Sequence, residues 1–262
     1  MIWHYTNAQG LLGILGSRTL WASSADYLND FSELHFGRTA FIAALDRVVK
    51  QLGGSTDEHG KPLRGWGLWV TAEHMRERFS PESVPRLPGA FVTSFCSDGD
   101  LLSQWRGYSG GAGFSIAFDE GLLASIKGAG SQLVPVVYGD EAIAVFADKI
   151  WAHLDGDDDL TVENLGDLLK HVSEFKHDSF KEEKEVRLRV QSSEAQEVRV
   201  RAQGDRLIPY VVLPFKDEAV VEIRVGPGLD QRTQASALRH FIKASGYGHE
   251  ITVSGSVAPF RN

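Results

Sequence analysis

Apolar and polar positions alternate irregularly along the chain, so that short strand-like runs are mixed with segments of helical period. Strands are predicted where apolar residues recur at every second position, over 2–5, 19–23, 91–96, 113–118, 134–138, 185–190, 198–200, 207–213, 220–225 and 250–254. Helices are predicted where the period is close to 3.6, over 9–15, 31–52, 161–180 and 233–244. This mixture predicts an α+β fold rather than a regular series of strand–helix–strand units.

Capping residues and loops refine these elements. Asn29-Asp30 precede the helix over 31–52, and Thr161 is predicted as the N-cap of the helix that carries apolar residues as far as Phe180. A polar loop is predicted over 53–65. Residues 192–195 turn the chain, so 198–200 is predicted as the hairpin partner of the strand over 185–190.

Composition indicates an ordinary globular protein. The chain is 42% hydrophobic and 24% charged, and it has no repeat, low-complexity tract or Pro/Ser linker, which predicts a single domain over residues 1–262. A net charge of −8 argues against broad affinity for nucleic-acid phosphates. The single cysteine, Cys96, excludes an intramolecular disulfide and a multi-cysteine zinc site, and is predicted to be a small buried side chain.

The chain starts without a basic region followed by an apolar core, and no apolar run reaches the roughly 20 residues that span a bilayer. We therefore expect no signal peptide, no membrane partner and a cytoplasmic location.

Two strings that look like functional motifs are excluded because the surrounding residues do not fit the motif. A G-x-S-x-G string at 107–111 is followed by a predicted strand, whereas a nucleophile elbow and a dinucleotide fingerprint both need a helix there. The aspartates in 155–159 have the initial spacing of a calcium loop, but Leu160 and Gly166 stand where glycine and glutamate are required.

His171, Glu174 and His177 recur at three-residue steps, whereas helical metal ligands favour the i, i+4 arrangement. We predict that they form the polar face of an amphipathic helix, and we predict no metal site.

Three segments carry polar residues that core packing does not demand. They are Trp3-His4-Tyr5-Thr6 on the first strand, Ser103-Gln104-Trp105-Arg106-Gly107-Tyr108 in a predicted loop, and Glu183 to Arg189 at the entry to a strand. Each has a plain structural alternative: a hydrogen-bonded histidine with core aromatics, loop aromatics that fill a hydrophobic seam, and a solvent-facing ladder of salt bridges.

The third segment has the clearest pattern. Alternation is expected to bury Val186 and its apolar neighbours on one face and to place Glu185, Arg187 and Arg189 together on the other. Neighbouring cations favour the ionised form of the carboxylate.

Taken together, the motifs resemble those of an uncharacterised family of bacterial domains, over essentially the whole chain. The residues that carry the resemblance are His4-Tyr5-Thr6, Leu28-Asn29-Asp30 with Glu33, Ser94-Phe95-Cys96, Leu102 to Tyr108, Phe180 to Arg187 with Glu183 and Glu185, and Ser256 with Pro259-Phe260-Arg261.

That family looks like a distant member of the ADP-ribosyltransferase superfamily. The resemblance implies an α+β fold with a split β-sheet around a central cleft that holds NAD, flanked by helices. It also implies three site elements, which here are His4 on the first strand, Thr93-Ser94-Phe95 with Tyr108 in the middle, and Glu183 with Glu185.

The resemblance implies a role for each site residue. Glu185 stabilises the positive charge that develops on the ribose, and Glu183, on the same strand face, orients the incoming nucleophile. His4 and Thr6 position the ribose, and Tyr108 or Tyr5 stacks on nicotinamide. Arg106 meets the pyrophosphate, and Ser94 and Arg187 are further NAD-binding candidates.

The leading hypothesis is therefore an NAD-consuming transferase or hydrolase, serving as a toxin or phage-defence effector. Its acceptor is open between protein, nucleic acid and a small molecule, and an immunity or antitoxin partner is a further expectation. One alternative is a non-catalytic module that binds a nucleotide or a partner. A weaker alternative is RNA binding through Arg187, Arg189, Arg199 and Arg201, aligned across the predicted hairpin. The enzymatic hypothesis depends on distant residues meeting around a dinucleotide-sized hollow.

Overall fold

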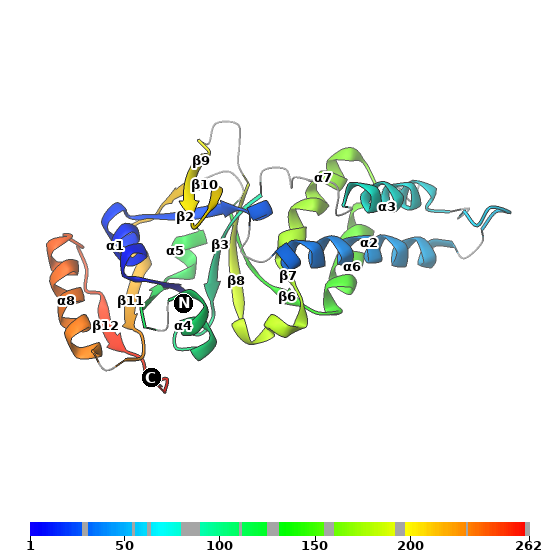
Figure 1. Cartoon of the computed structure of the whole chain (residues 1–262). Coiled ribbons are helices and arrows are strands. Elements are labelled where there is room, and N and C mark those ends of the chain that lie inside the picture. Colours follow the sequence, from blue (N-terminus) through cyan, green and yellow to red (C-terminus); the bar gives the residue numbers. More distant parts are fainter. Residues whose placement is uncertain are drawn as a thin grey trace. The chain divides into compact units, whose positions relative to one another are not determined.

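A computed structural model describes residues 1–27, 31–53, 56–61, 64–79, 90–109, 112–124, 131–154, 160–191, 197–228 and 230–259 (Figure 1). The chain divides into two compact units. Unit 1 comprises Met1–Ser24, Phe91–Pro135 and Glu182–Asn262, and unit 2 comprises Ala25–Ala90 and Val136–Lys181. This division describes contacts and not independent folding, so the single domain over 1–262 stays a prediction.

Unit 1 is built on one large mixed sheet. Its described strands run in the order β12-β11-β4-β1-β3-β2-β10-β9, and β8 pairs with both β3 and β5. The bounds are β1 Ile2–Thr6, β2 Thr19–Ser24, β3 Ala90–Cys96, β4 Phe114–Phe118, β5 Gln132–Pro135, β8 Glu185–Gln191, β9 Arg199–Gln203, β10 Arg206–Pro214, β11 Val220–Val225 and β12 Thr252–Gly255. The β11–β12 pair is parallel, whereas β1 with β4 and β9 with β10 are antiparallel.

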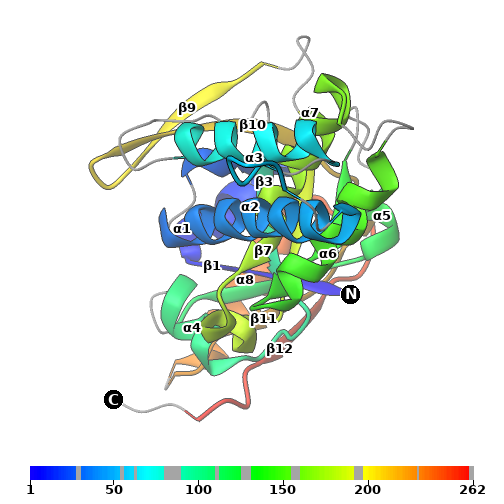
Figure 2. The ribbon, with the colours of Figure 1, turned by 90° about the vertical axis from the view of Figure 1, so that its right-hand side faces the viewer.

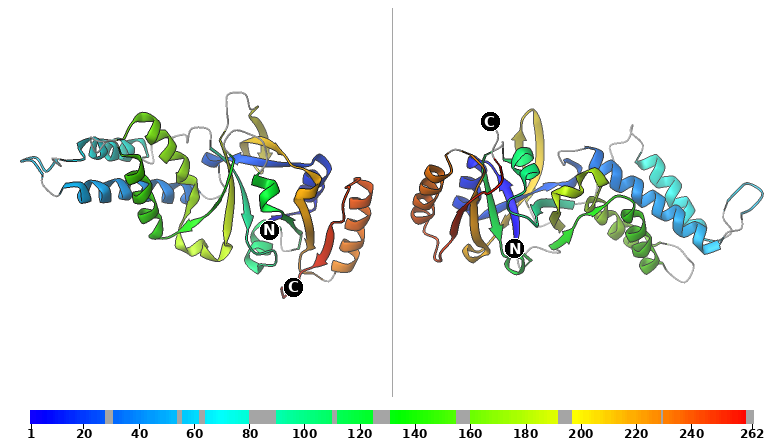
Figure 3. Two further views of the ribbon diagram at one scale, coloured as in Figure 1. Left: turned by 180° about the vertical axis from the view of Figure 1, so that it is seen from behind. Right: turned by 90° about the horizontal axis from the view of Figure 1, so that it is seen from below.

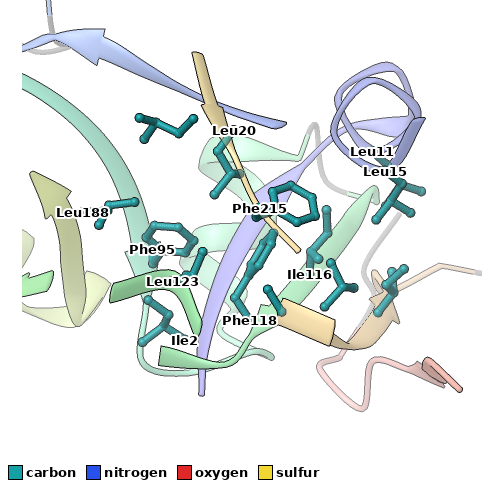
Figure 4. Packing of buried hydrophobic residues seen from close by; sticks show 14 of the residues in the cluster. Ile2, Leu11, Leu15, Leu20, Phe95, Ile116, Phe118, Leu123, Leu188 and Phe215 are labelled. Carbon is teal, nitrogen blue, oxygen red and sulfur yellow. The ribbon is translucent and has the colours of Figure 1, made fainter. Parts of the chain in front are cut away.

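The helices of unit 1 are α1 Ala8–Ser17, α4 Leu102–Tyr108, α5 Glu120–Ala124 and α8 Gln231–Ala244, with a 3-10 turn at Asp217–Ala219. Asn7 caps α1 by accepting from the Gly10 amide at 2.8 Å. Helix α8 lies beside β12 in both views of Figure 3. Figure 4 shows the core between these helices and the sheet, where the labelled side chains include Leu15, Ile116 and Phe118, each fully buried.

The sheet divides between β1 and β3. Strand β1 pairs with β4 along its whole length, from Ile2↔Phe118 to Thr6↔Phe114, but it meets β3 only at Trp3↔Cys96. Strand β3 also pairs with β2, at Ser23↔Val92 and Ser24↔Phe91, and with β8. Residues 93–95 of β3 lie outside the described pairs with β1 and with β2.

Unit 2 is mainly helical. Its helices are α2 Phe31–Gly53, α3 Trp66–Arg78, α6 Glu141–His153 and α7 Val162–Lys170, with 3-10 turns at Ala25–Tyr27, His171–Glu174 and Asp178–Glu183, the last of which runs on into unit 1. Strands β6 Val137–Tyr138 and β7 Phe175–Lys176 form a short parallel pair. Helices α2 and α3 pack along each other (Figure 2). At Gly37 of α2 a Cβ atom would lie 2.1 Å from the carbonyl oxygen of Val172, so only glycine permits this close approach.

The prediction of a mixed α+β fold is confirmed, with a large mixed sheet. Thr161 caps α7 as predicted, accepting from the Asn164 amide at 3.1 Å. The predicted cap at Asn29-Asp30, the aspartates of 155–159 and the tail residues Phe260-Arg261 lie outside the described residues.

Four sequence predictions are wrong about element type or pairing. The helix predicted to reach Phe180 ends at Lys170, and a 3-10 turn and β7 follow it. The strand over 134–138 is two short strands, and the loop over 103–108 is helix α4. Strand β9 pairs with β10 instead of β8. Helices α3 and α6 were not predicted.

The overextended helix has a simple cause. Apolar residues continue at three- and four-residue steps beyond Lys170, and a 3-10 turn of about three residues per turn satisfies that spacing too. Glu174 is buried, 6% exposed, and accepts from His171 Nδ1 at 2.8 Å, so this segment is not the polar face of a helix. In the described part of the chain, no cluster of three metal-ligating side chains occurs, and no helix is long and apolar enough to cross a membrane.

Candidate functional site

A hollow in unit 1 opens where β1 and β3 diverge. Its volume is about 70 Å³, and it is lined by Trp3, His4, Tyr5, Ser94, Phe95, Gln104, Tyr108, Glu183 and Glu185. Ligand pockets usually measure about 300–1,000 Å³. The hollow therefore accepts only one small group, and it is not the dinucleotide-sized space that the sequence interpretation required.

Glu185 is the first residue of β8, and its carboxylate is held by Arg187. Arg187 donates from Nε to one carboxylate oxygen at 2.7 Å and from Nη2 to the other at 3.0 Å. Glu185 is 6% exposed and Arg187 is 2% exposed. The two side chains share a strand face, as predicted, but the pair is buried, so the alternative of a solvent-facing ladder is wrong for these two residues.

Glu183 does not lie on the strand face of Glu185. It ends the 3-10 turn Asp178–Glu183, and Lys184 follows in the left-handed conformation with φ 47°. This turn brings Glu183 toward Tyr108, whose hydroxyl lies 3.5 Å from a Glu183 carboxylate oxygen. The predicted orientation on a common strand face is wrong, although both carboxylates line the hollow.

The backbone around Glu183 is tied to the end of β3. The Cys96 thiol donates to the Glu183 carbonyl at 3.0 Å, and the Ser97 amide donates to the Lys184 carbonyl at 3.0 Å. Lys184 Nζ also contacts an Asp98 carboxylate oxygen at 3.1 Å. Cys96 is buried, as predicted, and burial raises the pKa of its thiol to about 11. These contacts fix the two carboxylates relative to β3.

His4 bridges the gap in the sheet. Its Nδ1 lies 3.0 Å from the carbonyl oxygen of Ser94, and because a carbonyl only accepts, Nδ1 carries a proton and donates it. Its ring also meets Phe95 edge-on, with centroids 5.7 Å apart. Burial lowers the pKa of His4 below 6.5, an effect that the hydrogen bond to Ser94 partly opposes. In the neutral ring Nε2 is therefore an acceptor.

The lowered pKa of His4 predicts a dependence of stability on pH. The unfolded chain takes up a proton near pH 6.5, before the folded chain does, so the contribution of His4 is present above 6.5 and is lost as pH falls toward the folded pKa. His4→Asn keeps a donor for the Ser94 carbonyl but does not titrate. We expect the melting temperature of the wild type to fall more than that of His4→Asn between about pH 7.5 and about 5.5. Parallel curves over this range would contradict the assignment of a lowered pKa.

Tyr5 and Thr6 lie on β1 but are engaged in packing. The Tyr5 hydroxyl donates to the Asp98 carbonyl at 2.8 Å and accepts from the Leu101 amide at 2.8 Å, and burial raises its pKa. Thr6 packs against α1, where a Cβ at Gly10 would lie 2.1 Å from its Oγ1. The Tyr108 ring is 42% exposed, so it is accessible to a ligand, whereas Tyr5 is buried.

Helix α4 carries Gln104 and Tyr108 into the hollow, four residues apart on one helix face. Arg106 is exposed on the same helix and is not among the residues that line the hollow. The sequence prediction missed Gln104 because it assigned a loop here; the i, i+4 spacing is the signal that a helical interpretation would have supplied.

Asp100 holds α4 in place. One of its carboxylate oxygens accepts from Trp105 Nε1 at 2.8 Å and from the Ser256 hydroxyl, and the other accepts from the Val257 amide at 2.7 Å. Trp105 is fully buried and packs edge-on against Tyr5, with centroids 4.7 Å apart. The C-terminal segment therefore supports α4 and, through it, one wall of the hollow.

The predicted basic stripe for RNA does not form. Arg187 is buried against Glu185, and Arg189 on β8 donates to Gln132 on β5 at 2.6 Å. Arg199 and Arg201 lie on β9, which pairs with β10 and not with β8. These four arginines are therefore not aligned across a hairpin.

Comparison with curated proteins and with solved structures gave no match. A family model matches about a third of the chain, over a segment that contains Tyr108, Glu183, Glu185 and Arg187 but not His4. Residues 104–188 match the family described as protein of unknown function (DUF2971), which confirms for that segment the predicted resemblance to an uncharacterised domain family.

Proposed function

We propose that this protein cleaves the bond between nicotinamide and ribose in NAD and transfers the ADP-ribosyl group to an acceptor or to water. One observation carries the proposal: His4, Ser94, Tyr108, Glu183 and Glu185 come from separate elements and line one hollow. The meeting of β1 and β3 at a single described pair also supports the split-sheet fold of ADP-ribosyltransferases that the sequence resemblance implies.

The chemistry assigns a role to each group. When the bond between ribose C1′ and the pyridinium nitrogen breaks, its electron pair leaves with neutral nicotinamide, and positive charge develops on the ribose. A fixed carboxylate stabilises that charge without reorganising. The fork of Arg187 holds Glu185 in one orientation, and the proposal has a ribose hydroxyl donate a hydrogen bond to this carboxylate.

The remaining lining groups complete the proposed site. His4 Nε2 accepts from a second ribose hydroxyl, and the exposed Tyr108 ring stacks on nicotinamide. Glu183 accepts a proton from the nucleophile while the lone pair of the nucleophile attacks C1′. Because the hollow holds only about 70 Å³, the proposal places the nicotinamide end of NAD there and the rest of the dinucleotide outside it. Arg106, exposed on α4, is the proposed pyrophosphate contact.

The pairing of Glu185 with Arg187 also favours a second candidate function. A carboxylate held by an arginine fork suits a non-catalytic module that binds a partner, or one small group of a nucleotide, at the hollow of about 70 Å³. Roles as a toxin or phage-defence effector, an immunity partner and a cytoplasmic location are proposals that rest on the sequence resemblance and composition.

Release of nicotinamide from NAD tests the proposal. We expect the purified protein to release nicotinamide and Glu185→Gln to lower the rate by at least about 100-fold, because one electrostatic stabiliser of a transition state contributes that much. Glu183 lies outside the buried pair, and Glu183→Gln is expected to lower the rate of nicotinamide release about tenfold or more. The control Glu73→Gln removes an exposed carboxylate of unit 2 and keeps the wild-type rate.

Two results would contradict the proposal, the first its catalytic activity and the second the role of Glu185. Binding of NAD in a calorimeter with no release of nicotinamide would establish the non-catalytic alternative. A folded Glu185→Gln protein that turns over at the wild-type rate would remove Glu185 from the reaction.

A further inference from the structure

One face of β2, β10 and β9 in unit 1 carries aromatic and basic side chains, of which Trp21, Arg199 and Arg206 are exposed and Tyr210 is buried. Directly opposed residues of antiparallel strands share a face, and the pairs here are Trp21↔Val212, Ser23↔Tyr210, Arg199↔Tyr210, Arg201↔Ile208 and Gln203↔Arg206. Trp21, Tyr210, Arg199, Arg201 and Arg206 therefore lie on one face, which we call the aromatic face. The opposite face of these strands holds the core residues Val211 and Leu213.

Trp21 is placed for stacking. It is 49% exposed, whereas the Tyr210 ring beside it is 8% exposed, and their ring centroids lie 4.5 Å apart at an interplanar angle of 32°. A large exposed indole supported by a buried ring offers a flat apolar surface that is held rigidly by the sheet. Nothing in core packing requires this ring, because its strand neighbours Leu20 and Ala22 already face the core.

Arg201 adds a cation with spare hydrogen-bonding capacity. Its guanidinium carbon lies 5.9 Å from the centroid of the Trp21 ring, and Nη2 donates to Ser23 Oγ at 3.0 Å. Its Nε is buried and has no hydrogen-bond partner among the described residues. No carboxylate pairs with Arg201 in the described part of the chain, whereas Arg199 pairs with Glu197. Arg201 as a whole is only partly buried, so its charge can attract an anion at the surface of the sheet.

We infer that the aromatic face binds single-stranded nucleic acid, with a base stacked on Trp21 and a phosphate beside Arg201. A flat base next to an anionic phosphate matches the combination of an exposed indole and a cation. Arg201 and Arg206 make this face locally basic on a chain of net charge −8, because the charge of Arg199 is offset by Glu197, so binding is confined to the face instead of being spread over the protein. A duplex keeps its bases stacked inside and does not present them to Trp21.

The aromatic face adjoins the hollow on the sheet. Thr93 Oγ1 donates to the Trp21 carbonyl at 3.1 Å, so β2 and β3 still lie side by side at Trp21, and the next residue, Ser94, lines the hollow. The binding inference does not depend on NAD cleavage and is tested without NAD.

Fluorescence anisotropy with labelled oligonucleotides tests the inference. We expect single-stranded RNA or DNA to bind, a duplex of the same sequence to bind more weakly, and Trp21→Ala to lower affinity about tenfold or more through loss of base stacking. Trp21→Phe keeps a ring and is expected to retain most of the affinity. Arg201→Gln is expected to reduce the slope of log affinity against log salt by about one. The affinities for RNA and DNA oligonucleotides of the same base sequence show whether ribose or deoxyribose is preferred.

The matched control is Trp151→Ala, which removes a tryptophan that is 40% exposed on α6 of unit 2. It is expected to leave affinity unchanged, and thermal unfolding confirms that each variant is folded. Equal affinity of wild type and Trp21→Ala would overturn the inference, as would stronger binding of the duplex. The inference would also be overturned if a protein bound through Trp21 and no oligonucleotide bound.

Discussion

Replacing Arg187 with methionine is expected to lower the free energy of unfolding by about 3–5 kcal/mol, because it leaves a buried carboxylate without its cation. Glu185 and Arg187 are 6% and 2% exposed and are joined by two hydrogen bonds, so water cannot replace the lost partner cheaply. Methionine keeps much of the volume of the arginine stem, so the loss reports the missing charge rather than a cavity. Urea unfolding of both proteins measures the difference.

A double variant separates the pair from its surroundings. Adding Glu185→Gln to Arg187→Met removes both charges, and much of the lost stability is expected to return, since neutral replacement of a buried ion pair is often tolerated. The double-mutant cycle then gives the coupling between the two side chains. Additive losses would show that the fork contributes little beyond the separate contacts of each residue.

The Glu185–Arg187 pair shows which features of β8 could be predicted from the sequence and which could not. Alternation predicted that Glu185 and Arg187 share one face and that Val186, Leu188 and Val190 are buried on the other. The shared face and the burial of Leu188 and Val190 are confirmed, whereas Val186 is only partly buried. Burial of the charged face was not predictable, because it depends on β8 pairing with both β3 and β5, strands far away in the chain. Alternating charges on an exposed strand give the same sequence pattern.

Local patterns predicted elements well where a strand or helix is long or strongly periodic. Strand β1, strand β11 and helix α2 start and end within about two residues of their predicted bounds, the precision expected for such assignments. Helix α4 was missed because it is short, contains Gly107 and exists through contacts that no local pattern reveals. Unit 2 was not separated from unit 1 because the chain passes between them without a linker composition.

The candidate site could be predicted only in part. The residue types at 4, 94, 108, 183 and 185 were identified from the motifs, but their meeting at one hollow is a tertiary property. Lys184 illustrates the limit: its left-handed backbone rotates Glu183 away from the face of Glu185, and a non-glycine residue in that conformation is not expected from sequence. The volume of the hollow likewise follows from packing and has no sequence signal.

Trp105→Ala is expected to lower the free energy of unfolding by about 3–5 kcal/mol, the usual loss for a buried aromatic side chain. Trp105 is 0% exposed and packs in a small cluster with Trp3, Tyr5 and Cys96. Helix α4 covers only Leu102–Tyr108, which is too short to be stable alone, so its position depends on this anchor.

Trp105→Phe separates packing from the hydrogen bond. It retains most of the apolar volume but leaves Asp100 without the indole donor, so a smaller loss of about 1–3 kcal/mol is expected. Because α4 carries Gln104 and Tyr108, Trp105→Ala should also disturb the hollow, whereas Trp105→Phe should preserve it. Ligand binding at the hollow, measured on both variants below their unfolding transitions, is therefore expected to fall only with alanine. If alanine and phenylalanine gave equal losses of stability, the hydrogen bond to Asp100 and not aromatic packing would hold this wall of the site.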